Sequence, residues 1–131
     1  MLIVELNDLE VLNTNADAFL IGVKGYSSEC YKHFELVDVI KSLGGKPYLT
    51  DCNTLYVGGR KNALDHIQSA YENGFSPFST GCHILIGDGL KGTDDIAIPV
   101  EGAEHVKEAK IGRAVMDADV FVSLTHFKGH E

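Results

Sequence analysis

Apolar and polar positions along the chain fall into blocks that predict strands separated by helices. The first clear block, residues 18–24, is a short apolar run of the length expected for a buried strand. In residues 31–43 the apolar positions recur at three-residue spacing, which is typical of a helix with a wide apolar face. Gly44 and Gly45 follow directly, so we expect that helix to end there in a left-handed cap.

The same pattern continues to residue 125. The further elements that it predicts are a strand over 47–51, a helix over 61–73, a strand over 83–88, a β-hairpin of strands 96–100 and 106–111, a helix over 111–117 and a strand over 119–125. Strands that alternate with helices predict parallel strands joined by crossover helices. Pro99 cannot donate to a ladder, so its strand is expected at an edge.

We therefore predict one α/β domain over residues 1–131. Its expected architecture is a mostly parallel sheet flanked by helices, Rossmann-like and three-layered, with a β-hairpin excursion. The hydrophobic fraction of 44% and charged fraction of 23% are ordinary for a globular chain of this length.

The charge and the cysteines narrow the class of protein. A net charge of -8 disfavours partners that need a basic surface, so neither nucleic acid nor an acidic membrane is an expected partner. Cys30, Cys52 and Cys82 are odd in number and widely spaced, which indicates free thiols rather than disulfides. The first residues show no signal peptide. We therefore expect a cytoplasmic location.

Charged or titratable side chains stand where the predicted strands end. The carboxyl ends of parallel strands meet at one edge of a sheet, and ligands bind in the crevice there. A simpler interpretation stays open, because strands commonly run into polar loops and Asp-Gly is a common turn pair. The residues concerned are Lys24, Asp51, Asp88 and His126, with Lys128 and His130 just after the last strand.

The segment 51–60 adds the features of an anion-binding loop. Gly58 and Gly59 would let the backbone approach a ligand, and the following helix start would supply unpaired N–H groups. Arg60 is a two-pronged donor suited to carboxylate or phosphate, and Asn53 is a further candidate for contact with a bound group. The glycine spacing matches neither a P-loop nor a dinucleotide fingerprint, so an ordinary glycine-containing loop is the alternative.

Histidines near the C-terminus are candidates for proton chemistry. His126 would carry a proton, and Lys128 would neutralise an anion or act as a base. Two histidines with scattered acids are a weak sign of a metal, so no metal site is predicted. His66 lies near apolar positions of its predicted helix and is interpreted as a structural residue.

Several motifs together resemble a known family. They are Asp51-Cys-Asn-Thr-Leu-Tyr-Val-Gly-Gly-Arg60, Asn62-Ala-Leu-Asp-His66, Asn73-Gly-Phe75, Asp88-Gly-Leu-Lys-Gly92 and Ser123-Leu-Thr-His-Phe-Lys-Gly-His-Glu131. From about Lys24 onward the chain resembles a bacterial and archaeal family of unknown function, whose members are often described as iron–sulfur centre or ferredoxin-type proteins. The segment 24–29 departs from the glycine-acid loop usual in that family.

The resemblance implies a longer protein. In the family the final block is followed by a glycine-rich segment, a further α/β portion and often a cysteine-rich ferredoxin domain with four-iron clusters. It implies that residues 1–131 are an N-terminal fragment without a cofactor of their own, and that iron–sulfur clusters belong to the full-length protein. The family is also distantly similar to lactate racemase, a nickel-cofactor enzyme.

These observations give one main hypothesis and two alternatives. The sheet edge would bind a small anionic substrate or cofactor, with Asp51, Asp88 and His126 handling protons, in a protein linked to redox chemistry. Whether it is an enzyme stays open. The alternatives are a non-catalytic ligand-binding or scaffold domain for an electron-transfer module, and a metal-dependent isomerase or racemase. A homodimer through an open sheet edge after Thr125 is a further expectation.

Overall fold

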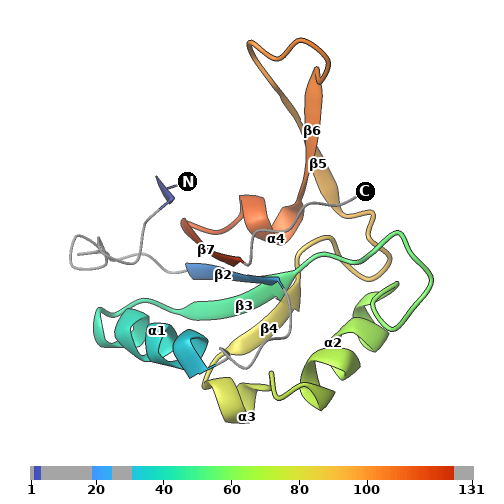
Figure 1. The fold of residues 1–131 in the computed structure, drawn as a ribbon. Coiled ribbons are helices and arrows are strands. Elements are labelled where there is room, and N and C mark those ends of the chain that lie inside the picture. Colours follow the sequence, from blue (N-terminus) through green and yellow to red (C-terminus); the bar gives the residue numbers. More distant parts are fainter. Residues whose placement is uncertain (1, 4–18, 25–30, 126–131) are drawn as a thin grey trace.

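A computed structural model describes residues 2–3, 19–24 and 31–125 of the chain, and side chains between Glu35 and Ser123. Its centre is a five-stranded parallel sheet with the strand order β1-β7-β2-β3-β4 (Figure 1). The strands of this sheet are β1 (Leu2–Ile3), β2 (Phe19–Lys24), β3 (Pro47–Asp51), β4 (His83–Ile86) and β7 (Val120–Thr125).

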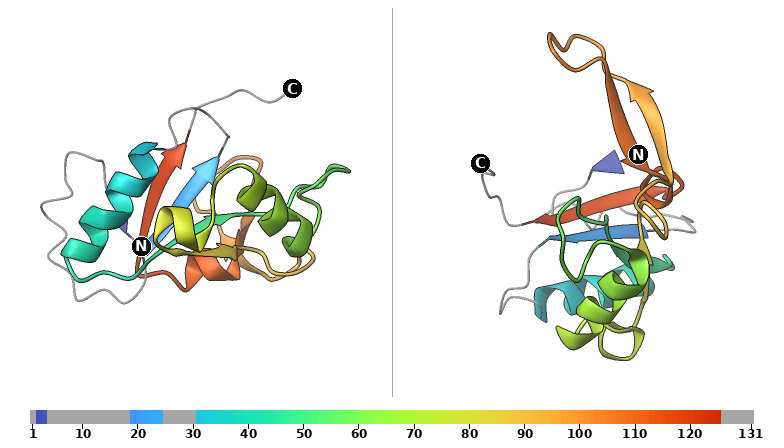
Figure 2. Two further views of the ribbon diagram at one scale, coloured as in Figure 1. Left: turned by 90° about the horizontal axis from the view of Figure 1, so that it is seen from below. Right: turned by 90° about the vertical axis from the view of Figure 1, so that its right-hand side faces the viewer.

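Most of the described helices lie together on one side of the sheet (Figures 1 and 2). They are α1 (Tyr31–Ser42), α2 (Ala63–Glu72) and α3 (Pro77–Thr80). The four-residue helix α4 (Arg113–Met116) lies on the other side, where its Ala114 carbonyl accepts a hydrogen bond of 2.6 Å from the Tyr48 hydroxyl of β3. The α/β class is confirmed, whereas the Rossmann-like three-layer arrangement is not.

The core forms where α1 packs against the sheet. Val37 and Ile40 of α1 are fully buried, and they belong to one cluster with Leu49 of β3 and Val122 of β7. Burial of each such side chain stabilises the fold by about 1.5–3 kcal/mol. The helix ends as the sequence predicts, because Gly44 adopts a φ of 87° that glycine tolerates and side chains disfavour.

The predicted elements agree with the structure in type and order, with ends that differ by at most two residues. Helix α2 begins at Ala63 rather than at residue 61, because the Asn62 side chain caps it by accepting from the N–H groups of Leu64 and Asp65. Two short elements were not predicted, β1 and α3. A two-residue strand and a single helical turn are too short to show hydrophobic periodicity.

The last strand lies inside the sheet. Strand β7 pairs with β1 on one side and with β2 on the other, with Val120 aligned to Leu2 and to Phe19. The pairing with β1 covers only Val120 and Phe121, and the homodimer expected through an edge after Thr125 stays a prediction. Among the described strands, β4 and β1 each have one neighbour in the sheet.

The predicted β-hairpin is present and projects from the sheet (Figure 1). It consists of β5 (Asp95–Pro99) and β6 (Glu108–Gly112), which pair antiparallel, with Ile96 opposite Ile111. In the described chain β6 is the only ladder partner of β5, so the edge position expected for Pro99 is confirmed.

Candidate functional site

Asp51 and Asp88 come from neighbouring parallel strands and lie at the same edge of the sheet. Asp51 is the last residue of β3, and Asp88 follows the end of β4 by two residues. The Gly87 N–H donates to the Asp51 carbonyl at 3.0 Å, which extends the β3–β4 pairing beyond Ile86. Parallel pairing thus places both carboxylates at the edge where the sequence predicted them.

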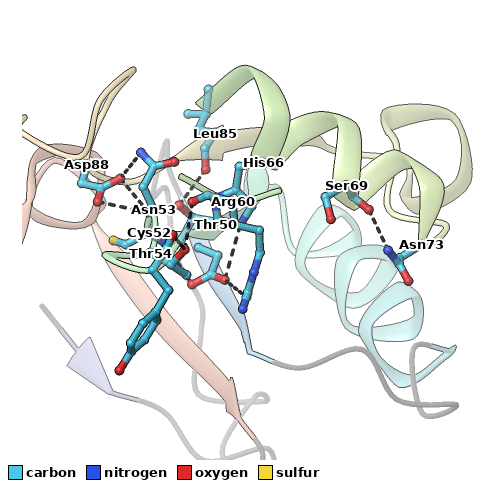
Figure 3. A network of polar contacts seen from close by, with 12 residues as sticks. Thr50, Cys52, Asn53, Thr54, Arg60, His66, Ser69, Asn73, Leu85 and Asp88 are labelled. Carbon is cyan, nitrogen blue, oxygen red and sulfur yellow. Dashed lines mark hydrogen bonds and ion pairs between the residues drawn. The ribbon is translucent and has the colours of Figure 1, made fainter. Parts of the chain in front are cut away.

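The Asp51 carboxylate faces two cationic or titratable side chains from the segment that follows it, Arg60 and His66, both of which are labelled in Figure 3. Its Oδ2 lies 3.5 Å from Arg60 Nη1 and 3.6 Å from His66 Nε2. Its Oδ1 accepts the Cys52 N–H at 2.8 Å. About a third of the Asp51 side chain and 38% of the Arg60 side chain are exposed, so this ion pair is accessible from solvent.

His66 was interpreted as structural, and its contact with Asp51 was missed. Its side chain is only 3% exposed, and its Nδ1 is buried without a hydrogen-bond partner in the described chain. Helix α2 carries this imidazole to the carboxyl end of β3, a placement that depends on tertiary packing. The only sequence signal was the Asn62–His66 motif within the family resemblance.

Asp88 serves to hold the loop that leaves β3. Its Oδ1 accepts the Asn53 main-chain N–H at 3.0 Å and the Asn53 side-chain Nδ2–H at 2.9 Å. The same amide nitrogen donates to the Gly89 carbonyl at 2.8 Å. The Asn53 Oδ1 is buried and has no partner among the described residues. Asp88 and Asn53, both predicted site residues, therefore contact each other.

Cys52 lies between these two acidic positions. Burial, followed by the negative charges of Asp88 and Asp51, raises the pKa of its thiol to about 11. The thiolate is the form that attacks electrophiles and binds metals. At neutral pH Cys52 is therefore protonated and a weak nucleophile.

The segment between Thr54 and Arg60 forms a closed loop. The Thr54 N–H donates to the Arg60 carbonyl at 2.8 Å, which ties its two ends together. Gly58 and Gly59 lie in this loop, and a Cβ added at either would meet nothing within 4 Å. Two N–H groups at the start of α2 already donate to the Asn62 side chain, so they do not face an open anion site.

The remaining predicted residues are not described at the level of side chains. Lys24 ends β2, where its backbone is paired with Thr125 of β7. His126, Lys128 and His130 lie outside the described residues. The strand order places the end of β7 two strands from β3, at the same edge of the sheet. The convergence of His126 with Asp51 stays a prediction.

The described residues contain neither a candidate metal centre nor a membrane-spanning helix. No group of three or more His, Cys, Asp or Glu side chains between residues 35 and 123 is arranged to hold a metal ion. In the same part of the chain, no helix has both the length and the apolar character needed to cross a membrane.

Comparison with known proteins gives one match. The model of a family described as a domain of unknown function, DUF362, matches residues 30–131 and so includes all of the loop and both acidic positions. Searches of curated proteins and of solved structures returned no match. The iron–sulfur character implied by the sequence resemblance is not part of this result.

Proposed function

This chain belongs to the DUF362 family, and we propose that it binds a small anionic substrate or cofactor at the carboxyl edge of β3 and β4. The observation that carries the proposal is the Arg60 guanidinium, which Asp51 holds in place while more than a third of the side chain stays exposed. A guanidinium has five N–H donors. The single contact with Asp51 leaves several of them for a carboxylate or phosphate.

The Asp51–Arg60 pair also reduces the cost of binding. An arginine side chain that is free to rotate loses conformational entropy when a ligand immobilises it. Asp51 restrains Arg60 before the ligand arrives, and the closed loop from Thr54 restrains its backbone. A preorganised, planar donor at a sheet edge suits an anion of bidentate geometry.

Proton transfer at this site would run through Asp51 and His66. Imidazole and carboxylate lie 3.6 Å apart between heavy atoms, which is longer than a hydrogen bond, so the two groups would have to approach each other for direct proton transfer. His66 is buried and Asp51 is partly exposed, so Asp51 would exchange protons with a ligand and His66 would support it. Asp88 is engaged with Asn53 and would position the loop.

The other predicted site residues have proposed roles in binding the anion. His126 would be a further proton carrier, and Lys24, Lys128 and His130 would contact the anion from the ends of β2 and β7. Asn53, Gly58 and Gly59 would shape the loop around it. We also propose a Rossmann-like sheet with three layers and a cytoplasmic location.

The proposed link to redox chemistry concerns a longer form of the protein. The thiols of Cys52 and Cys82 both have raised pKa values, chiefly because of burial, which disfavours the thiolates that iron–sulfur clusters require. We therefore propose that any cluster is held by cysteines outside residues 1–131. Iron and acid-labile sulfide analysis of anaerobically purified protein tests this: stoichiometric iron on residues 1–131 would contradict it.

The binding proposal is tested by titration with inorganic phosphate and with succinate at constant ionic strength, followed by calorimetry and thermal melting. We expect saturable binding by the natural chain and at least a tenfold weaker affinity for Arg60→Ala. Lys61→Ala is the matched control, since it removes the neighbouring exposed cation. Equal affinities of Arg60→Ala and the natural chain, or no binding of either anion, would refute the proposal.

The role of Asp51 is tested separately. Asp51→Asn removes the charge that orients Arg60 but keeps the shape of the side chain. We expect a lower affinity, so that saturation requires a higher anion concentration, with an unchanged circular dichroism spectrum. If the affinity rises instead, Asp51 competes with the anion for Arg60 and does not position it.

A further inference from the structure

The loop between Thr54 and Arg60 carries apolar side chains that the proposed ligand site does not explain. Leu55 is 99% exposed and Val57 is 92% exposed. Both lie within this loop, whose two ends are joined by the hydrogen bond between the Thr54 N–H and the Arg60 carbonyl. Large apolar side chains that are exposed close together on a loop are typical of a surface that another molecule covers.

More apolar and cationic side chains lie around the start of α2. The Ala63 N–H donates to the Leu90 carbonyl at 3.0 Å, so the loop after β4 lies beside the first turn of α2. The side chains of Leu64 and Leu90 are exposed there. Lys61 and Lys91 are exposed in the adjoining positions and form no ion pair with any described residue. We name Leu55, Val57, Leu64, Leu90, Lys61 and Lys91 the loop face.

The charge of the loop face sets the chemistry of its partner. The chain has 11 basic and 19 acidic residues, and two of the basic ones lie in this small region without an ion pair to any residue that the structure describes. A complementary surface would carry carboxylates beside an exposed apolar side chain. Contact between the loop faces of two copies is disfavoured, because it would bring the lysines of one copy close to the lysines of the other.

The tip of the β5–β6 hairpin has the required chemistry. Glu101 and Glu104 are exposed there, with the exposed Val106 beside them. We name these three residues the hairpin tip. Glu104 lies 3.9 Å from His105, and the exposed Lys107 donates to the Ala103 carbonyl, so the two carboxylates are the acidic groups of a mixed-charge tip. The hairpin projects away from the sheet, and in Figures 1 and 2 it lies apart from the loop at the start of α2. A two-stranded hairpin has little stability by itself, so contact with a partner would stabilise it.

We propose that the hairpin tip of one copy docks on the loop face of a second copy of this chain. Val106 would cover the apolar residues of the loop, and Glu101 and Glu104 would pair with Lys61 and Lys91. Each copy presents both surfaces, so two reciprocal contacts close a symmetric dimer. The interface uses strands other than β7. It includes Leu55 and Val57 of the loop that ends at Arg60, but not the Arg60 side chain itself.

The oligomeric state of the full chain tests the proposal. Light scattering after size-exclusion chromatography at 10–200 µM, concentrations chosen on the order of moderate affinities, should show a dimer that dissociates as salt is raised. Leu55→Ser with Val57→Ser should give a monomer with an unchanged circular dichroism spectrum. Phe78→Ser is the matched control, because Phe78 is 100% exposed on α3, outside both surfaces, and should leave the dimer intact.

Charge exchange identifies the two contacting surfaces. Lys61→Glu with Lys91→Glu, and separately Glu101→Lys with Glu104→Lys, should each give monomers, and an equimolar mixture of the two variants should form a dimer again. A monomeric natural chain, an equal effect of Phe78→Ser, or no recovery on mixing would overturn the proposal. The proposal would also be overturned if the natural chain is monomeric and sediments with phosphatidylserine vesicles, and if Leu55→Ser with Val57→Ser abolishes that sedimentation. Arg60→Ala should leave the dimer intact, so failure here is distinct from failure of the ligand site.

Discussion

Asp88 holds Asn53 by both its main chain and its side chain, with N···O distances of 3.0 and 2.9 Å to the same carboxylate oxygen. The contact fastens the loop after β3 to the loop after β4. The loop that carries Arg60 therefore starts from a fixed point beside the sheet edge. A carboxylate in this position acts on the site by fixing its geometry.

Replacing Asp88 should destabilise the fold measurably. Asp88→Asn removes the charge and turns one acceptor into a donor that faces the donors of Asn53. Loss of hydrogen bonds to a charged, part-buried group costs about 1.5–3 kcal/mol. Urea denaturation measures the free energy of unfolding. The matched control is Asp38→Asn on the exposed face of α1, which should change it by less than about 0.5 kcal/mol. Equal effects of the two variants would show that the Asp88–Asn53 contact is not stabilising.

Gly112 should tolerate no side chain. A Cβ at this position would lie 2.4 Å from the Gly87 carbonyl oxygen and 3.2 Å from the Asp88 nitrogen, both of them main-chain atoms. The hairpin would have to move away from the end of β4, and overpacking of this kind costs about 1–3 kcal/mol. We expect Gly112→Ala to lower the melting temperature by several degrees, whereas Gly59→Ala, with nothing within 4 Å, should not. A melting temperature for Gly112→Ala equal to that of the natural chain would contradict this packing.

The parts of the fold that could be predicted depend on local patterns. The helical spacing of apolar residues in α1 and the short apolar run that forms β2 are local signals, which predict each element whichever neighbour it has. The position of Asp51 and Asp88 at one edge also followed, because it requires only that β3 and β4 are parallel.

The parts that could not be predicted depend on tertiary placement. Strand β7 lies inside the sheet because β1, with two residues and no periodicity of its own, pairs with it. His66 lies on a buried face of α2, and the sequence alone does not distinguish a core histidine from one that reaches a carboxylate on another element. The Asp88–Asn53 contact joins residues 35 positions apart in two loops, where no pattern exists.

The cap of α2 should contribute to the rigidity of the loop before it. Asn62 Oδ1 accepts from the N–H groups of Leu64 and Asp65, both at 3.1 Å. Asn62→Ala should lower the free energy of unfolding by about 1 kcal/mol, and Asn62→Asp should recover most of the loss because aspartate is as good a cap. Urea denaturation gives both values. If Asn62→Asp is as unstable as Asn62→Ala, the stability comes from the hydrogen bond that the Asn62 side-chain N–H donates to the Asp65 carboxylate, and not from the cap.

Alkaline pH should weaken the fold through Cys52. Its folded-state pKa of about 11 lies above the ordinary thiol value of 9.0, so the folded chain retains this proton when the unfolded chain has lost it. The contribution to stability is therefore complete below pH 9 and is lost as the pH rises through 11. We expect urea midpoints to fall over this range, and to fall less for Cys52→Ala. Peptide-resolved alkylation provides an independent measurement, since the rate at Cys52 should rise about tenfold per pH unit below the pKa, as the thiolate fraction does. A rate that levels off near pH 9 would show that neither burial nor the two neighbouring carboxylates raise this pKa.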